Sequence, residues 1–121
     1  MTERGADMVR KTDQKVVREH AHGGAGQIEV YEILAPGELR GRVSVYAKVV
    51  LPPGAAIGLH PHRGETESYY VLSGSGVFVE DGGRRTAVEA GDICDISEGA
   101  CHGMENTGGT PMELIALVVP A

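Results

Sequence analysis

Short runs of β-branched and aromatic residues, separated by turns that contain glycine or proline, recur along this chain and restrict its fold more than any other feature. The 121 residues include 18 glycines and six prolines, and no segment after residue 25 keeps the apolar period of a helix. Pro53–Gly54 is one such turn, because proline fixes φ and glycine accepts positive φ. The pattern predicts a single all-β domain. The predicted strands cover residues 28–34, 43–51, 57–62, 67–73, 76–81, 85–89, 92–96, 100–105 and 112–119.

The first 26 residues differ from the rest of the chain. They are polar and mixed in charge, and we interpret residues 1–26 as an N-terminal arm that is either mobile or leads into an edge strand. Residues 27–121 then form the domain. His20 and His22 in the arm have a His-X-His spacing, but no carboxylate follows at a suitable distance. We therefore expect both histidines to be surface residues.

Charge and hydropathy argue against two classes of partner. The net charge is −6 and the basic residues are scattered, which gives no surface for nucleic acid. The longest apolar runs, such as 114–119, are too short to cross a bilayer, and the N-terminus lacks an apolar signal region. We expect a soluble, cytoplasmic protein with no membrane partner. In that compartment, Cys94 and Cys101 are expected to remain free rather than to form a disulfide.

Two of the predicted strands are apolar on both faces. A strand with one face in water should alternate apolar and polar residues, but 69–72 and 114–119 do not. Their outer faces therefore need a cover, which could be the N-terminal arm or a partner subunit. We favour the partner subunit and predict a homodimer.

Strand parity groups three polar side chains on one interior face. His60 and His62 are two residues apart and point to the same side of an extended segment. Glu67 has the phase of Tyr69 on the following strand. Burying an ionised carboxylate costs several kcal/mol unless the group is paired or bound to a cation.

A third histidine returns to the same interior later in the chain. A hairpin centred near Glu98 would place Cys94 opposite His102 and both on one face. Three neutral imidazoles and one carboxylate suit a divalent Fe, Mn, Ni, Co or Zn ion, and four protein ligands on an octahedral ion leave two positions open. Open positions are what a catalytic metal requires.

These residues also carry a family resemblance. Gly54, His60-Pro-His62, Glu67 and Gly74 match every fixed position of the first cupin motif, G(X)5HXH(X)3–4E(X)6G. The second motif, G(X)5PXG(X)2H(X)3N, is matched by the residues at 91, 99, 102 and 106, with serine at 97 where proline is usual. The chain thus resembles a small single-domain cupin. The resemblance implies a jelly-roll-like β-barrel of eight or more short antiparallel strands, with a metal held by His60, His62, Glu67 and His102.

Several neighbouring residues allow two interpretations. Tyr69 could donate a hydrogen bond to a bound oxygen or act as an acid, or it could be a core tyrosine. Glu65 is expected in a solvated loop, with a supporting or general-base role as the alternative. Cys94 is expected to be a small buried hydrophobe and Cys101 to face outward. Asn106 is expected to tie a turn through its side-chain amide.

The rest of the interior is expected to form a small cavity. Phe78 and four tyrosines are the only aromatic residues, so a large stacking pocket is not expected and a small, oxygen-rich substrate fits better. The predicted lining residues are Val45, Val49, Phe78, Met104, Met112 and Ile115.

These observations predict a metal-dependent enzyme acting on a small carboxylate, enol or diol. With iron, the site would support a dioxygenase reaction; with manganese, nickel or zinc, the ion would act as a Lewis acid in decarboxylation, isomerisation or lyase chemistry. The alternative is a non-enzymatic cupin that binds or senses a small ligand.

Overall fold

The computed structural model describes residues 8–121, and within them the chain is almost entirely β-structure. The only helices there are short 3-10 turns, η1 (Ala21–Gly23), η2 (Pro36–Glu38) and η3 (Asp81–Gly83), and no helix is long and apolar enough to cross a membrane. The strands are β1 (Lys15–Glu19), β2 (Gln27–Glu32), β3 (Val45–Leu51), β4 (Ala56–Pro61), β5 (Glu65–Ser73), β6 (Ser75–Glu80), β7 (Arg85–Glu89), β8 (Ile93–Ile96), β9 (Cys101–Glu105) and β10 (Met112–Pro120).

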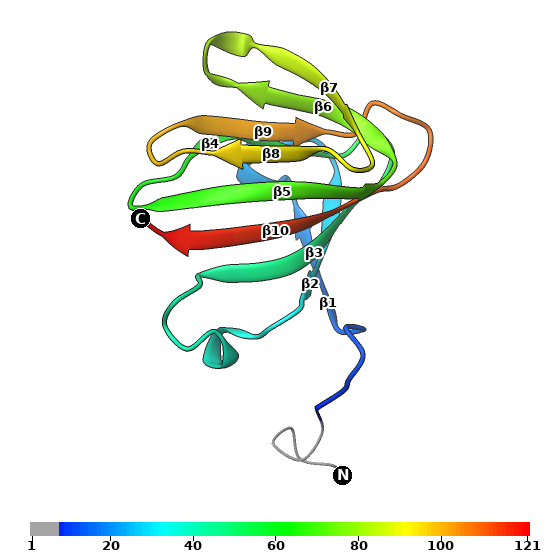
Figure 1. Cartoon of the computed structure of the whole chain (residues 1–121). Helices are drawn as coiled ribbons and strands as arrows, with labels where there is room; N and C mark the ends of the chain where they lie inside the picture. The colour runs from blue at the N-terminus through cyan, green and yellow to red at the C-terminus, as the bar shows by residue number, and fades with distance from the viewer. Residues whose placement is uncertain (1–7) are drawn as a thin grey trace.

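The strands form two antiparallel sheets that face each other (Figure 1). The larger sheet has the order β1-β2-β3-β10-β5-β8, and the smaller has the order β4-β9-β6-β7. The long strand β10 pairs with β3 on one side and β5 on the other, so it anchors the centre of the larger sheet. The all-β prediction is confirmed. The strands make two separate hydrogen-bonded sheets rather than one continuous cylinder.

The hydrophobic core lies between the two sheets. In β10 the side chains alternate between buried and half-buried, and Met112 and Leu114 are fully buried. Each such side chain contributes roughly 1.5–3 kcal/mol when it leaves water. Ile115 was predicted to line the interior, but it lies half-buried on the opposite face. Positions 112 and 115 differ by an odd number of residues, so their side chains leave a strand on opposite sides.

All nine predicted strands are present, with ends that differ by at most two residues. The predicted hairpin around Glu98 is wrong. β8 pairs with β5 in the larger sheet, where Cys94 lies opposite Tyr69, while β9 pairs with β4 and β6 in the smaller sheet. The turn at 97–100 carries the chain from one sheet to the other. His102 therefore reaches the interior from the smaller sheet and not from a hairpin.

The N-terminal region contributes a strand and a docked turn. β1 pairs with β2 at the edge of the larger sheet, so the edge-strand alternative holds for residues 15–19. The following turn passes against β4, where the Ala56 amide donates to the Ala25 carbonyl at 2.9 Å. Gly58 allows this contact, because a Cβ there would collide with the His22 carbonyl oxygen. The division into residues 1–26 and 27–121 stays a prediction, and residues 1–7 lie outside the described part.

Asn106 fastens the turn between β9 and β10 as predicted. Its side-chain amide donates to the carbonyls of Leu51 and Thr110 at 2.8 and 2.9 Å. Its Oδ1 accepts a hydrogen bond from the Gly108 amide at 2.9 Å. A buried amide with all three partners holds the ends of three strands together.

Candidate metal centre

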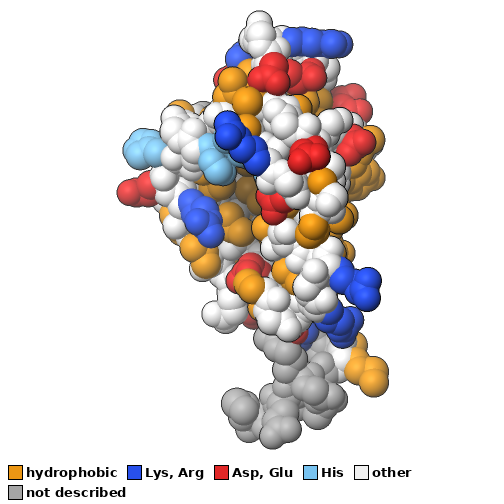
Figure 2. Space-filling view, turned by 90° about the vertical axis from the view of Figure 1, so that its left-hand side faces the viewer, with side chains coloured by type: hydrophobic (Ala, Val, Ile, Leu, Met, Phe, Trp, Pro, Cys, Tyr) orange, Lys and Arg blue, Asp and Glu red, His pale blue; other side chains and the backbone are white. Residues whose placement is uncertain are grey.

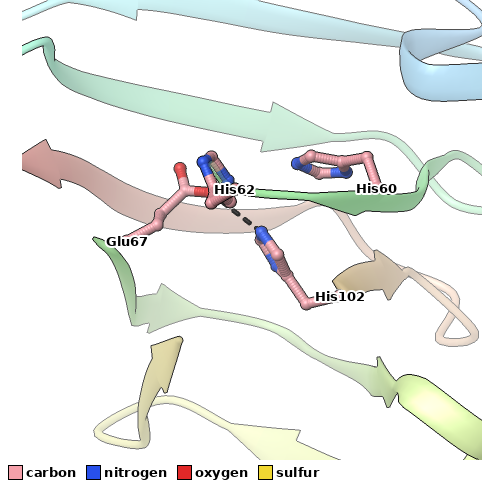
Figure 3. A group of neighbouring side chains, drawn as sticks. All are labelled: His60, His62, Glu67 and His102. Atoms are coloured by element: carbon pink, nitrogen blue, oxygen red, sulfur yellow. Dashed lines mark ion pairs between the residues drawn. The ribbon is translucent and has the colours of Figure 1, made fainter. Parts of the chain in front are cut away.

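Four side chains from both sheets converge on one interior volume (Figure 3). His60 lies on β4 and His102 lies directly opposite it on β9, in the smaller sheet. Glu67 comes from β5 in the larger sheet, and His62 follows the end of β4. The strand parity predicted from the sequence holds, because Pro61 is exposed between the two inward-facing histidines.

The ligand atoms of these four residues all lie within 4.8 Å of one another. Only 1% of His102 and 7% of Glu67 is exposed, and 11% of the His62 side chain. His62 Nε2 lies 2.6 Å from Glu67 Oε1, and His102 Nε2 lies 3.0 Å from the same oxygen.

Four buried polar atoms of the cluster have no partner in hydrogen-bond geometry. They are His62 Nε2, Glu67 Oε1 and both ring nitrogens of His102. Buried polar atoms normally have such a partner. A cation placed among them would satisfy the lone pairs of the two Nε2 atoms and of the carboxylate together. The cluster could therefore hold a metal ion.

Contacts on the outer side of the rings orient two of the histidines. His60 Nδ1 lies 2.7 Å from the Gly58 carbonyl oxygen, which can only accept, so Nδ1 carries the proton and Nε2 keeps its lone pair. His62 Nδ1 lies 3.4 Å from Glu65 Oε1, which favours the same tautomer. Such outer contacts are typical of histidines that bind metals.

Glu65 is not the solvated loop residue that we expected. β5 begins at Glu65, two residues earlier than predicted, and residues 65, 67 and 69 consequently share one face. Its side chain is 35% exposed and contacts His62. The expectation of a bystander was wrong, and the structure supports the alternative of a supporting role.

Burial sets the protonation of His60. Removal from water lowers the pKa of His60 to about 4, and the nearby imidazoles of His102, His22 and His62 act in the same direction, against the hydrogen bond to Gly58. The imidazole is therefore neutral at pH 7. Neutral imidazole is the form that binds a metal ion.

His20 and His22 are both exposed, as expected, but the His22 ring also lies against the site. The His22 and His60 rings are stacked, with centroids 3.6 Å apart and an angle of 8° between the planes. Burial lowers the pKa of His22, and this effect outweighs the opposing charge of Glu67. Its position depends on the docking of the η1 turn on β4, a long-range contact that the local sequence does not indicate.

A cavity of about 280 Å³ opens onto the cluster. Val45 and Val49 line it as predicted, whereas Phe78, Met104 and Met112 are buried in the core instead. Most of the other walls are apolar, and the polar lining is Arg18, His22, His60, His62, Glu65, Glu67 and Tyr69. A second hollow of about 780 Å³, bounded by the turn at 23–25 and β4, contains none of the four cluster residues.

Tyr69 lines the cavity and packs beside the cluster, with its ring centroid 5.1 Å from that of His102. Burial raises the pKa of Tyr69 well above its ordinary value, and the charge of Glu67 and a hydrogen bond between the two side chains add to the effect. The phenol therefore keeps its proton and acts as a hydrogen-bond donor rather than as a base. Its predicted catalytic role stays a prediction.

The two cysteines lie outside the cavity lining. Both are free, Cys94 buried and Cys101 half-buried. Burial raises the pKa of Cys94 to about 11, so at neutral pH it is an unreactive thiol. The Cys101 amide donates to Asp81 at 3.0 Å, which fixes the backbone one residue before His102.

The fold and this cluster define a cupin. The family model described as "Cupin domain" matches residues 47–119, and the chain belongs to this family. The chain is 40% identical over 97 residues to an oxalate-binding protein of Thermotoga maritima. This alignment covers 80% of this chain and 79% of that protein.

Solved structures agree with this assignment. The crystal structure of a predicted oxalate decarboxylase from Thermotoga maritima aligns with a TM-score of 0.89 and 34% identity, over 94% of this chain and all of that one. A Cupin 2 conserved barrel protein from Salinispora arenicola aligns with a TM-score of 0.76 over 96% of this chain and 91% of that one. Its 20% identity speaks for the fold alone.

Proposed function

We propose that this cupin is a metal-dependent enzyme that acts on a small, oxygen-rich carboxylic acid, with oxalate as the first candidate. The observation that carries the proposal is the cluster of three histidines and one glutamate at the wall of a small cavity. A divalent Mn, Fe, Ni, Co or Zn ion held there would supply a Lewis acid with open positions.

The residues around the ion would divide the remaining work. His60, His62 and His102 would present ring nitrogens to the ion, and Glu67 would present a carboxylate oxygen. Tyr69, which hydrogen-bonds Glu67 in this structure, would turn its hydrogen bond to a substrate oxygen. The apolar walls lower the local polarity, which strengthens the polar contacts inside the cavity.

The size and lining of the cavity support a small acid. About 280 Å³ suits a molecule of few atoms, and Tyr69 is the only aromatic side chain apart from the histidines among its described lining residues. A relative that is 40% identical is an oxalate-binding protein, and a similar solved structure is that of a predicted oxalate decarboxylase. Oxalate is therefore the first substrate to test.

Two reaction classes remain in competition, and one assay separates them. Decarboxylation converts oxalate and a proton into formate and carbon dioxide, with no net consumption of oxygen. A dioxygenase reaction consumes oxygen in proportion to product. We expect formate from the purified, metal-loaded protein and at least about 100-fold less from the His60→Ala variant, since a metal centre lowers the reaction barrier by several kcal/mol. Equal rates in the two proteins would refute the proposal.

The second candidate is a binding protein without turnover. The name of the oxalate-binding relative favours it. So does the cavity: among its described lining residues there is no lysine, and the one carboxylate besides Glu67 contacts His62. Tight oxalate binding by the metal-loaded protein, with no product from oxalate and no oxygen uptake, would favour this candidate over the enzyme.

We also propose that the protein is a homodimer. Tyr70 and Ile93 are cross-strand partners on the outer face of the larger sheet, exposed to 46% and 61%, with Leu72 exposed nearby. β1 lies at the opposite edge of this sheet and leaves these side chains uncovered. Light scattering should give twice the chain mass of 12.7 kDa. A monomer mass would refute the dimer. The predicted cytoplasmic location likewise remains a proposal.

A further inference from the structure

We propose that Arg18, on the edge strand β1, binds a carboxylate of the substrate and makes the cavity selective for anionic acids. The proposal rests on the proposed function, because it concerns the acid that the metal centre would bind. No motif draws attention to Arg18, which belongs to the segment that the sequence suggests is an arm.

The register of the larger sheet directs Arg18 to the cavity. Arg18 is the cross-strand partner of Ile28 on β2, and directly opposed residues in an antiparallel pair share one face. Ile28 is buried and lines the cavity together with His60 and His62. Arg18 lines the same cavity. The side chain of an edge strand thus reaches the mouth of the metal centre.

The charges around the cavity give Arg18 a decisive role. Among the described residues that line the cavity, the carboxylates are Glu65 and Glu67, and Arg18 is the only lysine or arginine. The formal charges of these two carboxylates and of a divalent ion cancel. The positive charge of Arg18 therefore sets the sign of the field that an entering anion meets. Without Arg18 the loaded centre would be formally neutral.

The guanidinium is available for a ligand. Within residues 8–121, Arg18 is exposed and has no ion pair or hydrogen bond to another side chain. Its charge is close enough to His22 to lower the pKa of that ring. Basic and histidine side chains lie next to each other on one face of the molecule (Figure 2). A guanidinium fork matches a carboxylate with two parallel hydrogen bonds, a geometry that lysine cannot reproduce.

The experiment measures ligand binding rather than turnover. Isothermal titration of the metal-loaded protein with oxalate, glycolate and pyruvate would compare the wild type with Arg18→Gln and Arg18→Lys. Arg42→Gln is the matched control, since Arg42 is exposed and does not line the cavity. Metal content and circular dichroism verify that each variant is folded and loaded.

We expect Arg18→Gln to weaken oxalate binding by about tenfold or more, the usual size of a charged hydrogen bond. Arg18→Lys should give a smaller loss, and Arg42→Gln should bind like the wild type. Unchanged oxalate affinity in a folded, loaded Arg18→Gln protein would overturn the inference and leave the proposed function standing. If the loaded wild type binds none of the three acids, both fail. If binding depends on Arg18 but no product forms, only the enzymatic proposal fails.

Discussion

His60 on β4 lies directly opposite His102 on β9, and the centroids of their rings are 4.5 Å apart. Cross-strand partners share a face, so this register alone brings two imidazoles to the same side of the smaller sheet. Glu67 meets them from the larger sheet. The strand pairing therefore brings together candidate metal ligands from segments far apart in the sequence.

Glu65→Gln should weaken metal binding without abolishing it. The carboxylate of Glu65 contacts His62 Nδ1 and favours the tautomer whose Nε2 faces the cluster. Loss of such an outer contact typically costs 10–100-fold in metal affinity. Competition with a chelator of known affinity measures the change. Glu19→Gln, an exposed substitution on β1, is the control, and equal affinity in both variants would show that Glu65 does not support His62.

Gly58→Ala should destabilise the fold through the N-terminal turn. The added Cβ would collide with the carbonyl of His22, a backbone atom that has no easy way to move. Overpacking of this kind typically costs 1–3 kcal/mol in the free energy of unfolding, which urea denaturation measures.

Gly37→Ala is the matched control for this substitution. Gly37 has open space around its Cβ direction, so the change should stay within about 0.5 kcal/mol. An equal loss of stability in the two variants would show that the contact between the turn and β4 is not the cause.

Tyr69→Phe should lower the turnover number and leave metal content unchanged. Because its pKa is raised by burial, the phenol is a hydrogen-bond donor at every pH at which the protein would be assayed. A positioned proton donor contributes roughly 10²–10⁴-fold, and its loss should appear in kcat with little change in the pH profile near neutrality. A wild-type kcat in a loaded Tyr69→Phe protein would assign Tyr69 to the core alone.

The ion pair between Arg85 and Glu105 should make a small contribution to stability that depends on pH. Two guanidinium nitrogens lie 3.1 and 2.7 Å from the two carboxylate oxygens. These hydrogen bonds lower the pKa of Glu105 below its ordinary value of 4.5. Because the pKa is lower in the folded state, the stabilisation is present above pH 4.5 and is lost as the pH falls through the folded value.

Glu105→Gln should therefore reduce stability at pH 7 by less than about 1 kcal/mol, since the pair is partly exposed. The difference from the wild type should shrink at pH 3. Urea denaturation at both pH values measures it, with Glu89→Gln as the control because Glu89 is exposed on β7. A difference that grows toward acid would contradict the assignment.

The strand pattern and the face of each strand could be predicted from the sequence because both are local. Because successive side chains of a strand point to opposite faces, a spacing of two residues is enough to group His60 with His62, and Glu67 with Tyr69. An error of two residues at the start of β5 was also enough to miss Glu65, which has the same parity as Glu67. Strand ends depend on hydrogen bonds to distant segments and are therefore the least certain part of such predictions.

The contacts between distant segments could not be predicted in this way. β8 and β9 are joined by a short turn, yet they pair in different sheets, and only the packing of the whole molecule decides this. His22 and Arg18 reach the cavity because an edge strand pairs with β2 and the turn after it docks against β4. Their sequence neighbourhood is polar and resembles an arm.

The metal content of the purified protein tests the central claim most directly. The protein should be produced without a histidine tag and analysed by mass spectrometry of its metals beside His102→Ala and His20→Ala. We predict about one divalent transition-metal ion per wild-type chain, the same for His20→Ala, and close to none for a folded His102→Ala protein after purification, because the three remaining ligands would hold the ion much more weakly. Full metal content in His102→Ala, or none in the wild type after reconstitution with Mn, Fe, Ni, Co and Zn, would contradict the account.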